Sequence, residues 1–162
     1  MLFKPTIVLN SVLDINKELL DNNGIKGLIL DLDNTLTTHN NPKPADGVLE
    51  WIDNMKKSGI SLIIVSNNRF DRVRPFAEAL GLDFVSDGAK PLTIGFKKAM
   101  FKMKLSFNEV AIVGDQFFTD ILGANLKRIK TIYVFPFELE KGIFFKIKRT
   151  LEKPFIPKRR KI

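Results

Sequence analysis

Two acidic residues, Asp31 and Asp33, lie two positions apart directly after an apolar run at residues 27–30. If that run is a strand, side chains two positions apart point the same way, so both carboxylates can face one substrate. A carboxylate can attack phosphorus to form an aspartyl phosphate, and a second acid nearby can protonate the departing alkoxide. The spacing therefore favours phosphoryl transfer, with Asp31 as the nucleophile and Asp33 as the general acid and base.

Three further polar stretches follow apolar runs in the same way. Ser66 and Asn67 come after the second run, Lys90 opens the segment after another, and Asp115 and Asp120 follow a later one. Ligands bind at the carboxyl ends of the strands in open parallel sheets, so these side chains are expected to lie together. We expect the Ser66 hydroxyl and the amides around Asn67 to donate hydrogen bonds to phosphoryl oxygens, and Lys90 to add positive charge.

A cation is also expected, because carboxylates and a phosphate in one pocket repel one another. A hard cation with oxygen ligands fits this donor set, and Mg²⁺ is the cofactor that we predict. Asp115 and Asp31 would supply carboxylate ligands, with the backbone carbonyl of Asp33 as a third. Asp120 would complete the outer shell of the metal or orient Lys90.

The elements that position these residues alternate between apolar runs and segments with helical spacing. This alternation is typical of a parallel sheet with crossover helices. Strands are predicted at residues 27–30, 62–65, 110–113 and 131–135, with a short extra strand at 83–86; helices are predicted near 16–22 and at 46–58, 72–80, 93–104 and 119–128. Pro75 is expected in the first turn of a short helix, where its missing N–H costs little.

In order, the four polar stretches resemble the signatures of the haloacid dehalogenase (HAD) phosphatases. The segment Asp31-Leu-Asp33-Asn34-Thr35-Leu36 is similar to the first signature, and the likeness extends over roughly residues 26–136. The chain most resembles the YqeG-type members of subfamily IIIA, whose relatives include mitochondrial and plastid phosphatidylglycerophosphatases. The resemblance implies a Rossmann-like α/β fold with a three-layer parallel sheet, a Mg²⁺ cofactor and phosphatase activity. The residues that would take the family's roles are Asp31, Asp33, Ser66, Lys90, Asp115 and Asp120.

The spacing of the signatures indicates a capless enzyme. Thirty-three positions separate Asp33 from Ser66, and twenty-four separate Ser66 from Lys90, enough for a helix and a strand each but not for an inserted cap domain. A capless chain suits phosphates on large or surface-bound molecules. The substrate that the resemblance implies is phosphatidylglycerophosphate, a phospholipid head group; a soluble phosphomonoester such as a nucleotide is the enzymatic alternative.

The composition sets limits on domain count, redox chemistry and location. The 162 residues are 44% hydrophobic, which suits a single domain with its own core, predicted at residues 1–136. No cysteine is present, so disulfides, thiolate ligands and a cysteine nucleophile are excluded. Polar residues interrupt the apolar start of the chain, so we expect a cytoplasmic rather than a secreted protein.

A basic tail is predicted at residues 137–162, where nine Lys and Arg residues stand against three Glu. Phe144, Ile147 and Leu151 share one helical face, with basic residues including Lys148 and Arg149 around it. This pattern is typical of an interfacial helix on an anionic membrane, but equally of a helix that packs its phenylalanines on the sheet and leaves its charges solvated. Both interpretations stay open.

Two non-enzymatic functions are weaker alternatives. The basic tail favours nucleic acid as a partner, but no recognised binding signature accompanies it, so nucleic acid is not the partner that we expect. A catalytically inactive interaction protein on the same fold conflicts with the intact acidic residues. His39, the one histidine, lies in a predicted loop without an orienting partner, and we assign it no catalytic role.

Overall fold

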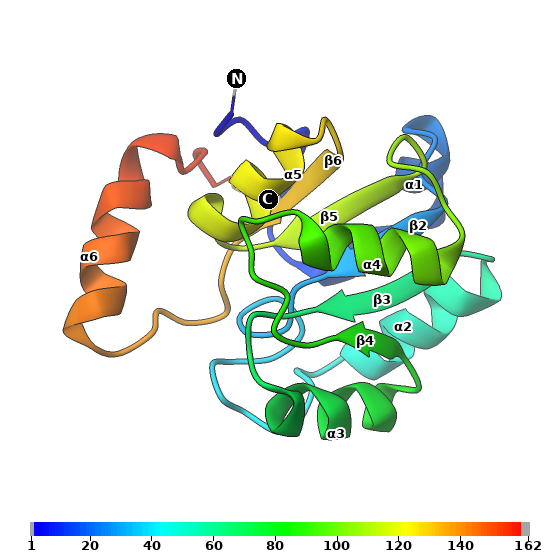
Figure 1. Ribbon diagram of the computed structural model, residues 1–162, viewed down its shortest axis with the longest axis horizontal. Helices are drawn as coiled ribbons and strands as arrows, with labels where there is room; N and C mark the ends of the chain where they lie inside the picture. The colour runs from blue at the N-terminus through cyan, green and yellow to red at the C-terminus, as the bar shows by residue number, and fades with distance from the viewer. Residues whose placement is uncertain (1, 160–162) are drawn as a thin grey trace.

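The computed structural model describes residues 2–159 and shows an all-parallel sheet flanked by helices on both faces (Figure 1). The strands are β1 (Ile7–Leu9), β2 (Gly27–Leu30), β3 (Ser61–Val65), β4 (Asp83–Val85), β5 (Val110–Gly114) and β6 (Lys130–Val134). They lie side by side in the order β1-β6-β5-β2-β3-β4. The predicted Rossmann-like α/β fold is confirmed.

The register of the sheet places the predicted site residues at one edge. In β2, Leu30 pairs with Ile64 of β3 on one side and with Val113 of β5 on the other. The three central strands therefore end within a residue or two of each other. Asp31, Ser66 and Asp115 all follow at this carboxyl edge, as the polar stretches after each apolar run predicted.

The helices are α1 (Lys17–Asn22), α2 (Val48–Lys57), α3 (Phe70–Leu80), α4 (Ile94–Met103), α5 (Leu122–Leu126) and α6 (Ile143–Glu152). Two short 3₁₀ turns, Val12–Asp14 and Lys153–Phe155, and a π-helical turn, Phe117–Ile121, complete the described elements. The helix predicted at 119–128 is thus two elements, because a wide π turn precedes the short α5.

Alternating strand residues build two cores, one on each face of the sheet. Leu28 and Leu30 of β2 pack into the core that α2 and α3 cover, whereas Ile29 between them packs into the core that α4 covers. Side chains alternate along a strand, so a strand buried on both faces is apolar throughout. This explains why the central strands appear in the sequence as unbroken apolar runs.

The prediction that Pro75 lies in the first turn of a short helix is wrong. Helix α3 begins at Phe70, and Pro75 is its sixth residue. A proline there leaves the carbonyl of Asp71 without its helical donor. Both residues are exposed, so water can satisfy that carbonyl and the helix continues through the proline to Gly81, which ends it with a left-handed φ of 62°.

Helix α6 lies beside the layered domain, next to the carboxyl edge of the sheet (Figure 1). The boundary after residue 136 stays a prediction about domain organisation, and the last residues of the predicted tail, 160–162, lie outside the described part. Among the described residues, no helix has the length and apolar character needed to cross a membrane.

Candidate active site

Lys90 lies at the centre of a buried ion cluster at the carboxyl edge of the sheet. Its Nζ donates to Oδ1 of Asp31 at 2.5 Å and to Oδ1 of Asp120 at 2.6 Å. All three side chains are almost completely shielded from solvent. Of the two predicted roles for Asp120, orienting Lys90 is therefore the one for which a direct contact exists.

Asn67 fixes the backbone of Lys90 rather than pointing its side chain into the site. Its amide Nδ2 donates to the carbonyl of Lys90 at 3.0 Å, and its Oδ1 accepts from the N–H of Lys90 at 2.7 Å. The loop after β3 is thereby joined to the segment before α4. Ser66 is buried beside this pair and accepts hydrogen bonds from Asn68. The phosphate-binding roles of Ser66 and of the amides around Asn67 remain predictions.

Three carboxylates form a cluster that can hold a cation. Asp31, Asp115 and Asp120 each offer one oxygen, and these oxygens lie within 4.8 Å of one another. Oδ1 of Asp115 is buried and has no hydrogen-bond partner among the described residues. Leaving a buried carboxylate oxygen unsatisfied is costly. A divalent cation with oxygen ligands fits this donor set and would remove that cost.

Gly114 makes the close approach of two of these acids possible. A Cβ at this position would collide with the carboxylate of Asp120, so no other residue fits the end of β5 without moving Asp120. The π turn then brings Asp120 back toward the strand end, since its backbone N–H bonds to the carbonyl of Gln116. π turns frequently occur at functional sites.

Asp33 lies outside this three-carboxylate cluster, and its side chain is held by three donors. Asn68 Nδ2 donates to Oδ2 at 2.6 Å, while Arg72 and the N–H of Asn40 donate to Oδ1 at 2.9 and 3.0 Å. Its predicted role as a metal ligand concerned the backbone carbonyl and stays a prediction. Its role as the general acid and base also stays a prediction.

Burial raises the pKa of Asp31 to about 7; the charge of Asp120 adds to the shift and that of Lys90 opposes it. Burial likewise raises the pKa of Asp115 well above its usual value, against the effect of Arg149. Burial acts to lower the pKa of Lys90, but Asp120 and Asp31 outweigh it and the pKa is raised. Lys90 is therefore a permanent cation, and the acids need a further positive charge to ionise fully.

These shifts predict that a metal ion stabilises the protein more at high pH. The folded pKa of Asp31 lies above its ordinary 3.8, so the folded chain binds the proton more tightly and loses stability as the pH rises toward about 7. A divalent cation binds the ionised carboxylates and offsets this loss. We expect Mg²⁺ to raise the melting temperature more at about pH 8 than at about pH 5.5. An equal increase at both values, or the same increase in Asp115→Asn, would contradict the cation site.

Arg72 and Asn68 are functional candidates that the sequence analysis missed. Arg72, in the first turn of α3, bonds both Asp33 and the carbonyl of Asn41, and so ties the loop after β2 to the helix after β3. Its side chain is 20% exposed. The sequence offered one signal for Arg72: it is a basic residue in the first turn of the helix that follows the second apolar run.

Replacing Arg72 with methionine is expected to lower the turnover number about tenfold to a hundredfold, because a misplaced acid and base protonates the leaving group poorly. Arg74→Met is the matched control: Arg74 lies on the same helix and is exposed, and it forms an ion pair with Glu78 and a cation–π contact with Phe70. Steady-state phosphate release from both variants makes the comparison. Equal turnover in the two would show that Arg72 does not position Asp33.

Helix α6 also contributes to the site, through an arginine that was predicted to lie around the apolar face. Arg149 donates to Oδ2 of Asp115 at 2.5 Å and to its carbonyl at 3.1 Å. The same guanidinium bonds both carboxylate oxygens of Glu140, at 2.9 and 3.1 Å, and Oε2 of Glu152 at 3.2 Å. Arg149 occupies one oxygen of Asp115 and leaves the unpartnered Oδ1 for a cation.

Glu152 holds the segment between Asp115 and Asp120. It is fully buried, and its Oε1 accepts from the N–H groups of Phe117 and Phe118 at 3.0 and 3.3 Å. Lys148, one turn earlier, bonds the side chain of Gln116. Lys148 and Arg149, which the sequence placed around the apolar face of the helix, thus bond to the segment after β5.

Comparison with known proteins identifies the family. A model described as haloacid dehalogenase-like hydrolase matches residues 39–126, and one described as mitochondrial PGP phosphatase matches residues 1–74. Asp31 and Asp33 fall within the second match, and Lys90, Asp115 and Asp120 within the first. The probable phosphatase YqeG of Bacillus subtilis strain 168 is 36% identical over 151 residues, covering 93% of this chain and 88% of that protein.

Two solved structures share the fold at low sequence identity. An uncharacterized protein from Listeria monocytogenes serotype 4b is 19% identical, with a TM-score of 0.56 and coverage of 74% of this chain and 86% of the other. The cobalt-bound deoxy-D-mannose-octulosonate 8-phosphate phosphatase of Haemophilus influenzae is 18% identical, with a TM-score of 0.53 and coverage of 81% and 89%.

The chain belongs to the haloacid dehalogenase-like hydrolases, a family whose members use a divalent metal. Within that family it is a YqeG-type phosphatase, and so a phosphomonoester hydrolase. The resemblance drawn from the four polar stretches is confirmed.

Proposed function

We propose that this enzyme removes the terminal phosphate of a phospholipid head group, phosphatidylglycerophosphate, through an aspartyl phosphate on Asp31, with Mg²⁺ as the cation. The buried cluster in which Lys90 bridges Asp31 and Asp120, beside the unpartnered oxygen of Asp115, carries the catalytic assignment. The match of residues 1–74 to the mitochondrial PGP phosphatase model supports the lipid substrate.

The side chains divide the reaction between them. A carboxylate oxygen of Asp31 attacks phosphorus, the bond from phosphorus to the alkoxide breaks, and Asp33 gives the alkoxide a proton. In the second half, Asp33 takes a proton from water, the water oxygen bonds to phosphorus, and inorganic phosphate leaves Asp31 as the carboxylate. Lys90 neutralises charge on the phosphoryl oxygens throughout.

A bound Mg²⁺, held by Asp115, Asp31 and the backbone carbonyl of Asp33, would neutralise the carboxylates and orient the phosphoryl group. Arg149 and Lys90 hold the surrounding oxygens before the substrate arrives, Arg149 on Asp115 and Lys90 on Asp31 and Asp120. A site held in this way needs little rearrangement on binding, which lowers the cost of reaching the transition state.

The open architecture favours a large substrate. Between Asp33 and Ser66 the chain forms a loop, α2 and β3, and between Ser66 and Lys90 it forms α3 and β4. Neither segment contains a cap domain. A phosphate at the end of a membrane lipid can enter a site that has no cap to open.

The test measures phosphate release from phosphatidylglycerophosphate in vesicles and from p-nitrophenyl phosphate in solution, each with Mg²⁺ and with a chelator. Asp31→Asn serves as the inactive control in both assays. The proposal expects metal-dependent hydrolysis of the lipid that requires Asp31. Hydrolysis of the soluble ester alone would retain the catalytic assignment and replace the lipid with a soluble phosphomonoester.

A further inference from the structure

Helix α6 presents its apolar side to solvent and its charged side to the domain. Ile143, Phe144, Ile147 and Leu151 are 79, 73, 56 and 59% exposed. They lie at helical spacings of three and four residues and so form one continuous stripe, the α6 apolar face. Of the two interpretations left open by the sequence, the one in which the helix packs its phenylalanines on the sheet does not fit this arrangement: Phe144 is exposed, and the ring of the half-buried Phe145 contacts His39, which lies outside the sheet.

The inner side of the helix explains this orientation. Arg149 and Glu152 are one turn apart, and both bond to the segment that follows β5. Glu152 is fully buried and the Arg149 side chain is 12% exposed. Turning the helix to bury its apolar face would remove Arg149 from Asp115. It would also leave the carboxylates of Glu140 and Glu152 without a cation. The active site therefore holds the apolar face outward.

We propose that the α6 apolar face docks on the surface of an anionic phospholipid membrane. Among residues 141–159, every exposed charged residue is basic: Lys141, Lys146, Lys153, Lys158 and Arg159. An apolar stripe flanked by basic residues binds acidic lipid by two additive effects, burial among acyl chains and attraction to head groups. A protein partner would have to supply an acidic rim around an apolar groove, whereas an anionic bilayer presents both along its whole surface.

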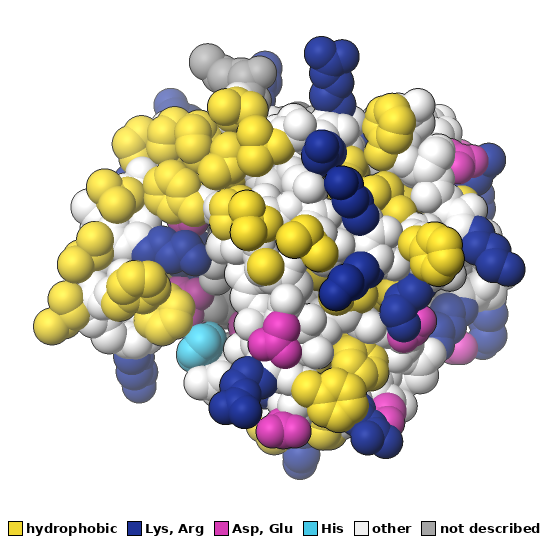
Figure 2. Space-filling view, in the orientation of Figure 1, with side chains coloured by type: hydrophobic (Ala, Val, Ile, Leu, Met, Phe, Trp, Pro, Cys, Tyr) yellow, Lys and Arg dark blue, Asp and Glu magenta, His cyan; other side chains and the backbone are white. Residues whose placement is uncertain are grey.

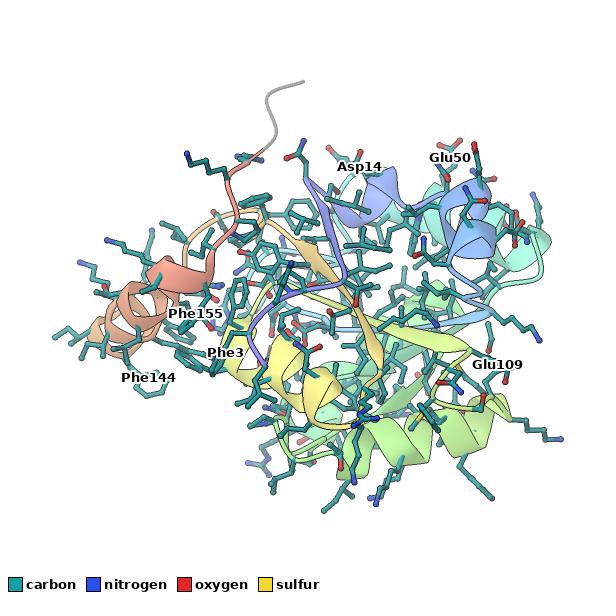
Figure 3. All side chains as sticks on the ribbon, turned by 90° about the horizontal axis from the view of Figure 1, so that it is seen from above. Phe3, Asp14, Glu50, Glu109, Phe144 and Phe155 are labelled. Carbon is teal, nitrogen blue, oxygen red and sulfur yellow. The ribbon has the colours of Figure 1, made fainter. Side chains whose placement is uncertain are left out.

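The apolar surface continues past the end of α6. Figure 2 shows hydrophobic side chains gathered over α6 and the region above it in that view. Phe155 lies beside Phe3 (Figure 3), and the two rings stack with centroids 4.5 Å apart. Both residues line a cavity of about 600 Å³ together with Pro154 and Val8. Figure 3 also shows Phe144 on the outer side of the helix. The proposed membrane side thus includes both the exposed α6 apolar face and an apolar cavity.

Docking in this way would bring the active site to the lipid. Arg149 joins α6 directly to Asp115, so only the width of the helix, about 10 Å, separates the apolar face from the carboxylate cluster. A phosphate on a lipid head group lies within that distance of the acyl chains. This inference extends the proposed lipid substrate, but binding is measurable without turnover, so the two can fail separately.

The experiment is flotation of the full chain with phosphatidylcholine vesicles that contain or lack phosphatidylglycerol. We expect binding that requires the anionic lipid. Phe144→Ser with Ile147→Ser is expected to weaken partitioning about tenfold or more, because two large side chains no longer enter the acyl region. Phe101→Ser, which changes an 87% exposed phenylalanine on α4, is the matched control and should leave binding unchanged.

The outcomes separate the alternatives. Equal flotation of the Phe144/Ile147 double variant and the wild type would overturn the membrane surface. A second result would also overturn it: a wild-type protein that is dimeric in solution and a double variant that is monomeric, because a second copy of the chain would then cover the α6 apolar face. If wild-type protein floats but does not hydrolyse phosphatidylglycerophosphate, the docking surface stands and the proposed substrate fails. If it hydrolyses detergent-dispersed lipid but never floats, the docking surface fails and the substrate stands.

Discussion

Asp31→Asn is expected to lower phosphate release at least about a thousandfold while the protein stays folded. The amide cannot attack phosphorus, and the other acids of the site are engaged elsewhere. Asp120 is held by Lys90, Asp115 by Arg149, and Asp33 by Arg72 and Asn68. The substitution is nearly isosteric. It removes a buried carboxylate, and burial raises the pKa of that carboxyl group to about 7. The melting temperature of the metal-free protein should therefore not fall.

The measurement combines single-turnover phosphate release with thermal unfolding. Asp53→Asn is the control, since Asp53 is an exposed carboxylate on α2 and its ion pair is with Lys57 of the same helix. It should retain full activity. If Asp31→Asn keeps activity comparable to this control, the aspartyl phosphate mechanism is wrong. If the Asp31→Asn variant loses activity only because it unfolds, its melting curve will show a lower melting temperature.

Arg149→Met is expected to lower the free energy of unfolding by about 3–5 kcal/mol near neutral pH, because it removes the cation from a buried ion cluster. Three carboxylates, on Asp115, Glu140 and Glu152, are each at most 1% exposed in their side chains and share this one guanidinium. The methionine fills much of the volume but neutralises none of the charge. We also expect weaker binding of Mg²⁺, since the carboxylate of Asp115 is no longer held.

Chemical denaturation and calorimetric titration of Mg²⁺ into the substrate-free protein measure the two effects. Lys146→Met is the matched control, because Lys146 is exposed on the same helix and has no described ion pair. Its stability should change by less than about 0.5 kcal/mol. Arg149→Lys should restore part of the stability but less of the metal affinity, since an ammonium cannot hold several carboxylates in a planar fork. A neutral effect of Arg149→Met would show that α6 is not docked on the site.

Three residues of the candidate site could be placed from the sequence because each directly follows a strand. The central strands are buried on both faces, so they appear as apolar runs, and the polar residues after them must emerge at one edge. Asp31, Ser66 and Asp115 were found in this way. Lys90 and Asp120 needed the order of the four signatures as well, since a lone lysine or aspartate has no such local signal.

Other contacts had no signal in the local pattern. A short helix was predicted because proline in a helix interior leaves a carbonyl without its hydrogen-bond donor. Pro75 is exposed, so water can take the place of that donor and the helix is longer. The sequence assigned no role to Arg72, and none to Asn68 beyond its place beside Ser66 and Asn67; the fold brings both within hydrogen-bond distance of Asp33. Their roles depend on residues more than thirty positions away.

The sequence by itself determined the sheet, the family and the acids at its edge, because burial of strands is a periodic property of adjacent residues. Only the tertiary structure decided which way α6 faces. The amphipathic pattern of that helix is compatible with either side inward, and the apolar side would ordinarily be buried. Three buried carboxylates that need one cation reverse the preference: Asp115 directly follows β5, Glu140 lies in the connection to α6, and Glu152 ends α6. These three carboxylates come close to Arg149 only once the chain has folded, so the local sequence pattern cannot show that they outweigh burial of the apolar side.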